Sequence, residues 1–301
     1  PMRAKIDSHG HVFTKASTEF PREVSQLMPE DRQESVEKLL AEMENNRIDQ
    51  AVLVQTGGAN IASHTYLLYC LKSYPKCFLG IGLIPLDTSD CASHMDRLAE
   101  NSAIIGFRLS SLGGPRDPFA PIDVSRFDTF PIWKRAAEQD YVLWLYLRAI
   151  DAHLIPYLLE EFPQVRVVIN HLGICPGMGK FSVDQDGRPQ VETPSYNPAF
   201  HTTHRLARYE NVMIHLSGQY AFSKEAYPYR DLAGWHRSLV GIYGAESLMW
   251  ATDFPWIFNN PGYGKMARII DELLPELSEH EHTQIMGGNA KCFLRFPDCQ
   301  N

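Results

Sequence analysis

Short apolar runs rich in Val, Ile, Leu and aromatic residues recur along the whole chain of 301 residues. Each run has the length of one buried strand. We predict eight strands, at Ala4–Ser8, Ala51–Gln55, Phe78–Ile84, Ile104–Leu109, Tyr141–Leu147, Val165–Asn170, Val212–Leu216 and Leu248–Thr252. Between most of them lie amphipathic segments that are typical of surface helices. The clearest of these predicted helices are Ser35–Asn46, Ile132–Gln139, Ala152–Glu161 and Leu232–Tyr243.

Near-continuous apolar strands that alternate with amphipathic helices predict a parallel sheet covered by helices. Eight such units favour a single α/β domain over residues 1–301, a (β/α)8 or TIM barrel. A doubly wound open sheet is the alternative, but no G-x-G-x-x-G motif follows the first strand. The segment 173–199 is rich in Gly and Pro. We expect it to be an active-site loop after the sixth strand.

Composition and charge narrow the choice of partners. The net charge is −8 and the basic residues are scattered, so nucleic acid is an unfavourable partner. The chain has no apolar leader at its start and no apolar stretch of membrane-spanning length. We therefore expect a cytoplasmic protein that acts on a small molecule and binds no membrane. The sequence leaves open whether it forms a homo-oligomer.

Polar residues at the ends of the predicted strands carry the candidate chemistry, because a barrel enzyme builds its site there. Strand one ends in Asp7-Ser8-His9-Gly10-His11, and strand alternation places the two imidazoles on one side. Such a pair can bind one divalent metal ion, with zinc or manganese as candidates. On its own, an H-x-H pair is more often two surface or hydrogen-bonded histidines.

Strand six ends in His171 and strand eight in Asp253, so three histidines and a carboxylate are expected at one barrel mouth. Asp253 could accept a proton from an attacking water. The structural alternatives are a helix cap for Asp253 and a hydrogen-bonded barrel histidine for His171.

The sequences around these residues resemble the amidohydrolase superfamily, in particular its amidohydrolase-2 branch, which includes pyrone-dicarboxylate and sugar lactonases. The matching motifs are Asp-Ser-His9-Gly-His11, Val-Ile-Asn-His171-Leu-Gly, Met-Trp-Ala-Thr-Asp253-Phe-Pro and Gly-Asn289-Ala. The resemblance spans nearly the whole chain, and it implies a barrel hydrolase.

The chain departs from many metal-dependent members of that superfamily, which carry a histidine on strand five and often a lysine on strand four. Neither is present, because strand five reads Val142-Leu-Trp-Leu-Tyr146 and strand four reads Gly106-Phe-Arg108-Leu-Ser110. A binuclear centre is therefore not expected. A single metal ion would rest on His9, His11 and Asp253, with His171 as a ligand or an acid–base partner. The resemblance also includes lactonases thought to work without metal, in which the same histidines polarise the ester carbonyl.

Four further residues are candidates for binding substrate. Arg108 on an apolar strand suits a substrate carboxylate, with an internal salt bridge as the alternative. Arg230 resembles a substrate-binding residue of the lactonases, or is a surface residue held by a neighbouring aspartate. Tyr146 stands where the strand-five histidine would be, or is core packing. Thr56 precedes Gly57-Gly58 and could help bind an anion, although Gly-Gly is more often only a turn.

Our leading hypothesis from these residues is a hydrolase that opens a carboxylated lactone or related cyclic ester, with water activated by Asp253. The alternative is a metal-dependent, non-oxidative decarboxylase of an aromatic or unsaturated carboxylic acid, which usually keeps the strand-five histidine. A third hypothesis is a barrel that binds a small acid without converting it. The base beside three imidazoles argues against this third hypothesis.

Overall fold

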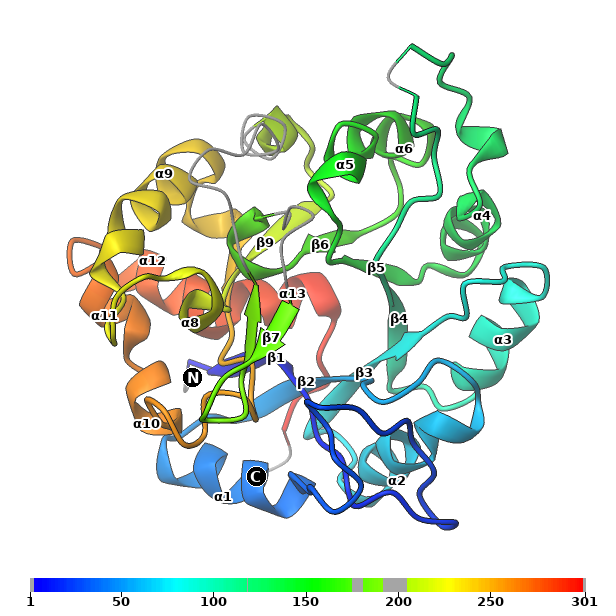
Figure 1. Ribbon diagram of the computed structural model, residues 1–301. Helices are drawn as coiled ribbons and strands as arrows, with labels where there is room; N and C mark the ends of the chain where they lie inside the picture. The colour runs from blue at the N-terminus through cyan, green and yellow to red at the C-terminus, as the bar shows by residue number, and fades with distance from the viewer. Residues whose placement is uncertain (1–2, 118, 175–180, 192–204, 300–301) are drawn as a thin grey trace.

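The computed structural model describes residues 3–117, 119–174, 181–191 and 205–299. Eight parallel strands form one sheet in the order β1-β2-β3-β4-β5-β6-β9-β10. They are β1 Ile6–Gly10, β2 Gln50–Val54, β3 Phe78–Leu83, β4 Ile104–Leu109, β5 Val142–Leu145, β6 Val167–Ile169, β9 Val212–Leu216 and β10 Leu248–Trp250. Each of the eight predicted strands overlaps one of them, and helices surround the sheet (Figure 1). The predicted (β/α)8 barrel is confirmed.

The helices follow the strands around the outside of the barrel (Figure 1). They are α1 Val36–Asn45, α2 Thr65–Ser73, α3 Cys91–Leu98, α4 Phe130–Gln139, α5 Ala149–Ala152, α6 Ile155–Glu161, α8 Gln219–Phe222, α9 Ala233–Tyr243, α10 Tyr263–Met266, α11 Ile269–Leu273, α12 Glu279–Thr283 and α13 Asn289–Leu294. Ser35 and Asn46, the predicted ends of the first helix, are the caps of α1. No described helix has the length and apolar character needed to cross a membrane.

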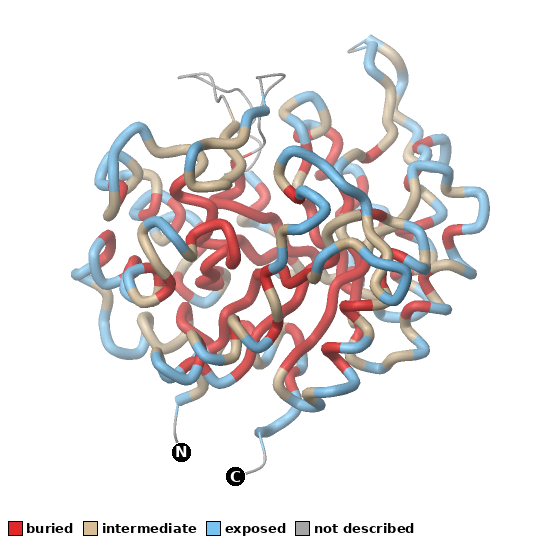
Figure 2. The backbone as a smooth tube through the Cα atoms, turned by 60° about the horizontal axis from the view of Figure 1, so that its bottom comes forward, coloured by how far each residue is buried: buried red, intermediate tan, exposed pale blue. Residues whose placement is uncertain are grey.

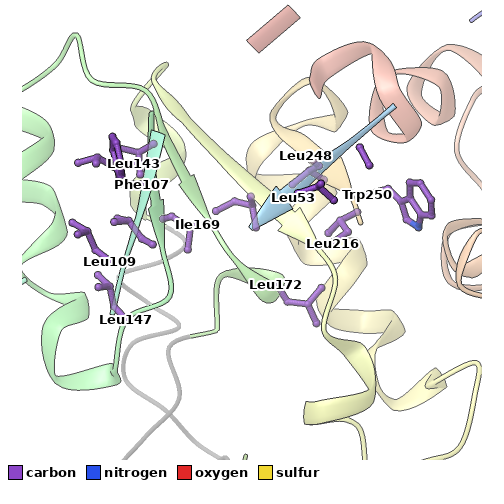
Figure 3. Close-up of a cluster of buried hydrophobic side chains, with 14 of the residues drawn as sticks. Leu53, Phe107, Leu109, Leu143, Leu147, Ile169, Leu172, Leu216, Leu248 and Trp250 are labelled. Carbon is purple, nitrogen blue, oxygen red and sulfur yellow. The ribbon is translucent and has the colours of Figure 1, made fainter. Parts of the chain in front are cut away.

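Strand alternation divides the buried side chains into two layers. One layer fills the barrel and includes Ile6, Val54, Ile81 and Trp144. The other layer packs between strands and helices (Figure 3), where Leu53, Phe107, Leu143, Ile169, Leu216 and Trp250 lie. Buried segments accordingly run through the centre of the molecule, and exposed segments cover its outside (Figure 2). This division explains why both faces of most strands are apolar in sequence.

The barrel closes where the first strand meets the chain that follows the last strand. Gly10 pairs in parallel with Phe254, and the amide of Asp253 donates to the carbonyl of His9 at 3.0 Å. The amide of His11 donates to the carbonyl of Phe254 at 2.6 Å. Backbone bonds at the closure therefore place Asp253 directly beside the histidine pair.

A two-stranded antiparallel hairpin, β7 Phe181–Val183 and β8 Pro189–Val191, lies over the barrel mouth (Figure 1). Its tip is held by Arg32, which donates to the carbonyl of Gly187 at 2.9 Å. Asn260 also holds it, by donating to Asp186 at 3.0 Å. The hairpin belongs to the segment predicted as an active-site loop, whereas residues 175–180 and 192–204 lie outside the described residues.

Candidate active site

Asp253 is the centre of the site, and all three predicted histidines surround it. Its Oδ1 lies 3.4 Å from His11 Nε2 and 3.6 Å from His9 Nε2. Its Oδ2 lies 4.0 Å from His171 Nε2. The sequence prediction that these four residues converge at one barrel mouth agrees with this arrangement.

The backbone at two of these residues adopts an unusual conformation. Asp253 has a φ of 61° and His171 a φ of 47°, in the left-handed region that non-glycine residues rarely adopt. Such conformations cost free energy and are found more often at functional sites. The left-handed conformation of both residues therefore favours the functional interpretation over an ordinary helix cap or a passive barrel residue.

Gly218 makes room for His171. It has a φ of 72°, and a Cβ atom there would lie 2.8 Å from the Cγ and Nδ1 atoms of the His171 ring. On the same side, His171 Nδ1 lies 2.8 Å from the hydroxyl of Ser217. The segment after β9 therefore fixes the orientation of the His171 imidazole.

The two strand-one histidines differ in the hydrogen bonds made by their Nδ1 atoms. His11 Nδ1 lies 2.8 Å from the carbonyl of Val54, which can only accept, so this nitrogen carries a proton. His9 Nδ1 lies 2.9 Å from the indole nitrogen of Trp144, which can only donate. A neutral His9 therefore carries its proton on Nε2, the nitrogen that faces Asp253.

Electrostatics favour an uncharged His9 and an ionised Asp253. Burial lowers the pKa of His9 well below its usual value, and the positive charge of Arg108 lowers it further. Burial would raise the pKa of Asp253, but His171, His11 and a hydrogen bond from Tyr220 outweigh it, so this pKa is lowered. The carboxylate is thus ionised near neutral pH, which is the protonation state that a general base needs.

Tyr220 is a site residue that the sequence did not reveal. Its hydroxyl donates to Asp253 Oδ2 at 2.7 Å and occupies that oxygen. The other oxygen, Oδ1, is buried and has no described hydrogen-bond partner, and His9 Nε2 is in the same state. A water or substrate oxygen that lies beside this pair and contacts both atoms would satisfy both of them.

The site meets the distance requirement for a metal ion, but His9 does not meet the chemical one. His9, His171 and Asp253 offer ligand atoms that all lie within 4.8 Å of one another, so they form a candidate metal site. Metal-bound histidines normally donate their second ring N–H to an acceptor. His9 instead accepts at that position from Trp144, so binding a metal through Nε2 would require an imidazolate. The donor set therefore does not fit a metal ion bound through His9.

A cavity of about 240 Å³ opens above Asp253, and its lining includes three of the predicted substrate-binding residues, Thr56, Arg108 and Tyr146. Arg108 Nε donates to Asn170 at 3.0 Å, and its guanidinium lies 4.9 Å from the Tyr146 ring centre. The alternative for Arg108 was an internal salt bridge. No described carboxylate forms an ion pair with its guanidinium.

Arg230, the fourth predicted substrate-binding residue, and the barrel residue His215 lie in different surroundings. Arg230 is exposed, forms a 3.2 Å ion pair with Glu272 and is not among the residues that line the cavity. We therefore leave it out of the candidate site. His215 on β9 is fully buried, and its ring centre lies 5.3 Å from that of His9.

A parallel barrel with imidazoles at the ends of β1 and β6 and an aspartate after β10 defines an amidohydrolase-type site. Residues 6–296 match the amidohydrolase-2 family, and the chain belongs to that family. No curated protein matches the sequence.

Several solved structures share the fold. A probable 2-pyrone-4,6-dicarboxylic acid hydrolase of Acinetobacter baumannii, solved with citric acid, is 20% identical with a TM-score of 0.72, covering 97% of this chain and 99% of the other. An amidohydrolase of Burkholderia multivorans with bound zinc is 18% identical with a TM-score of 0.73, covering 98% and 100%. A 2,6-dihydroxybenzoate decarboxylase from Rhizobium is 15% identical with a TM-score of 0.66, covering 98% and 99%. These similarities establish the fold, which is shared by hydrolases and decarboxylases.

Proposed function

We propose that the protein hydrolyses a carboxylated lactone or a related cyclic ester. The observation that carries the proposal is the buried Oδ1 of Asp253, which has no described partner and lies 3.6 Å from the equally unpartnered His9 Nε2. One atom can accept a proton and the other can donate one. A water molecule and an ester carbonyl are the reactants that such a pair suits.

In the proposed reaction, Asp253 takes a proton from water, and the resulting hydroxide attacks the lactone carbonyl. The Nε2–H of His9 stabilises the negative charge that develops on the carbonyl oxygen. The bond to the ring oxygen then breaks, and the proton held by Asp253 passes to that oxygen. The product is a ring-opened hydroxy acid, or its keto form where the ring oxygen was enolic.

Arg108 supports an acidic substrate. Its guanidinium borders the cavity above Asp253 and has no described carboxylate partner. A partly buried guanidinium is stabilised by an anion that it can bind through two hydrogen bonds. Tyr146 packs beside it. Because Asp253 and Arg108 line the same cavity, a substrate carboxylate bound to Arg108 would lie in the same cavity as the base.

The proposal is tested with Asp253→Asn and a control, Asp87→Asn, on an exposed loop outside both the site and the cavity. We expect the first variant to lose about 10²–10⁴-fold in turnover of 2-pyrone carboxylates, as removal of a general base does. The control should keep wild-type turnover. If Asp253→Asn retained full turnover, Asp253 would not be the base.

Decarboxylation is the second candidate, because the fold is shared with a 2,6-dihydroxybenzoate decarboxylase. In the decarboxylases that this chain resembles, a strand-five histidine is usual, and Trp144 and Tyr146 occupy that strand end here. Release of carbon dioxide from an aromatic acid, without ring opening of any lactone, would favour this candidate. A requirement for zinc or manganese would also favour it. The expected cytoplasmic location and any homo-oligomer stay predictions.

A further inference from the structure

A second cavity adjoins the one above Asp253. It has a volume of about 610 Å³ and lies at the carboxyl ends of β3 and β4. Arg108 and Tyr146 line both cavities, so these two side chains form the wall between them. The first cavity, at about 240 Å³, is smaller than the range of about 300–1,000 Å³ in which most small-molecule sites fall. The two together lie within that range.

The lining of the second cavity is mainly apolar. The apolar residues that line it include Leu83, Ile84, Pro85, Leu109 and Ile132. Apolar surface of this kind binds hydrocarbon groups by removing them from water. The second cavity therefore suits an alkyl or aryl group rather than a second polar group.

Positive charge is scarce around both cavities. Among the described residues that line them, Arg108 is the only arginine or lysine. Asp128 lines the second cavity and would repel an anion there. Among the described residues, a substrate with two carboxylates would thus leave one of them without a cationic partner, which is costly in a partly buried site.

We propose that the substrate is a lactone with a single carboxylate and an apolar substituent. This inference rests on the proposed lactone hydrolysis and names its substrate class. The carboxylate binds Arg108, the ester lies in the cavity above Asp253, and the substituent extends past Tyr146 into the second cavity.

The test compares four 2-pyrone-6-carboxylates that differ at ring position 4, where they carry hydrogen, butyl, phenyl or a second carboxylate. We expect the kcat/KM for ring opening to be at least about tenfold higher for the phenyl and butyl compounds than for the unsubstituted compound. The dicarboxylate should be the poorest substrate. A dicarboxylate that exceeds the phenyl compound would overturn the inference.

Two variants locate the substituent. Ser110 lines the second cavity, so Ser110→Phe should reduce the preference for phenyl over hydrogen by about tenfold. Ser89→Phe adds the same bulk on the neighbouring loop without lining either cavity, and the preference should not change. An unchanged preference in Ser110→Phe would place the substituent elsewhere.

Binding to the Asp253→Asn variant, measured by calorimetry, separates this inference from the proposed reaction. If the phenyl compound binds more tightly than the dicarboxylate but the wild type opens neither, the pocket assignment holds and the lactone hydrolysis fails. If ring opening occurs and binding favours the dicarboxylate, the reaction holds and the substrate class is wrong.

Discussion

Replacing Trp144 by phenylalanine tests the role assigned to His9. The indole N–H donates to His9 Nδ1 at 2.9 Å, and both residues are fully buried. Leaving a buried acceptor without its donor costs about 1–3 kcal/mol. The same free energy biases a neutral His9 towards the form with its proton on Nε2. Every 1.4 kcal/mol corresponds to about a tenfold change in an equilibrium.

Trp144→Phe should therefore lower kcat/KM for lactone hydrolysis by about 10–100-fold. The reason is that His9 would less often carry its proton on Nε2, the nitrogen that donates to the developing oxyanion. It should also raise the affinity for zinc, because Nε2 of His9 can now present a lone pair. Steady-state kinetics on the metal-free protein measure the first effect, and calorimetric titration with zinc measures the second.

The control is Trp133→Phe on α4. Trp133 is also fully buried, and its indole nitrogen has no described hydrogen-bond partner. Both variants should lose stability in chemical denaturation, since both lose buried volume. Only Trp144→Phe should alter turnover and zinc affinity. Wild-type kcat/KM together with wild-type zinc affinity in Trp144→Phe would refute the tautomer assigned to His9.

Two more substitutions test the geometry around Asp253. Gly218→Ala should destabilise the fold by about 1–3 kcal/mol and reduce turnover, because the new Cβ would lie 2.8 Å from the His171 ring. The control is Gly241→Ala on α9, where a Cβ meets nothing within 4 Å. This control should change neither stability nor turnover. Tyr220→Phe removes a hydrogen bond that lowers the pKa of Asp253, so the base is protonated at higher pH and the acidic limb of the kcat/KM profile should move to higher pH. An unmoved limb would show that Asp253 does not control it.

Most of the fold could be predicted from the sequence because buried parallel strands are apolar on both faces. The convergence of His9, His11, His171 and Asp253 also followed, since polar residues at strand ends of a barrel share one mouth. These residues follow the carboxyl ends of predicted strands, and in a parallel barrel this position alone places their side chains at the same mouth.

The residues that refine the chemistry could not be predicted in the same way. Trp144 looks like an ordinary core residue, and its contact with His9 depends on how β1 and β5 face each other across the barrel. Tyr220 lies in the segment after β9, whose path is set by the left-handed turn at Gly218. Arg230 shows the opposite case, because its motif suggested a role in binding substrate, whereas its side chain pairs with Glu272 and is not among the described residues that line the cavity.

The most direct test of the account is to assay metal-free protein with 2-pyrone carboxylates in heavy-oxygen water. The account predicts ring opening, one heavy oxygen in the new carboxylate, no carbon dioxide and no increase in rate on adding zinc or manganese. Carbon dioxide release, or turnover that appears only after metal is restored, would contradict hydrolysis by Asp253 and its imidazoles.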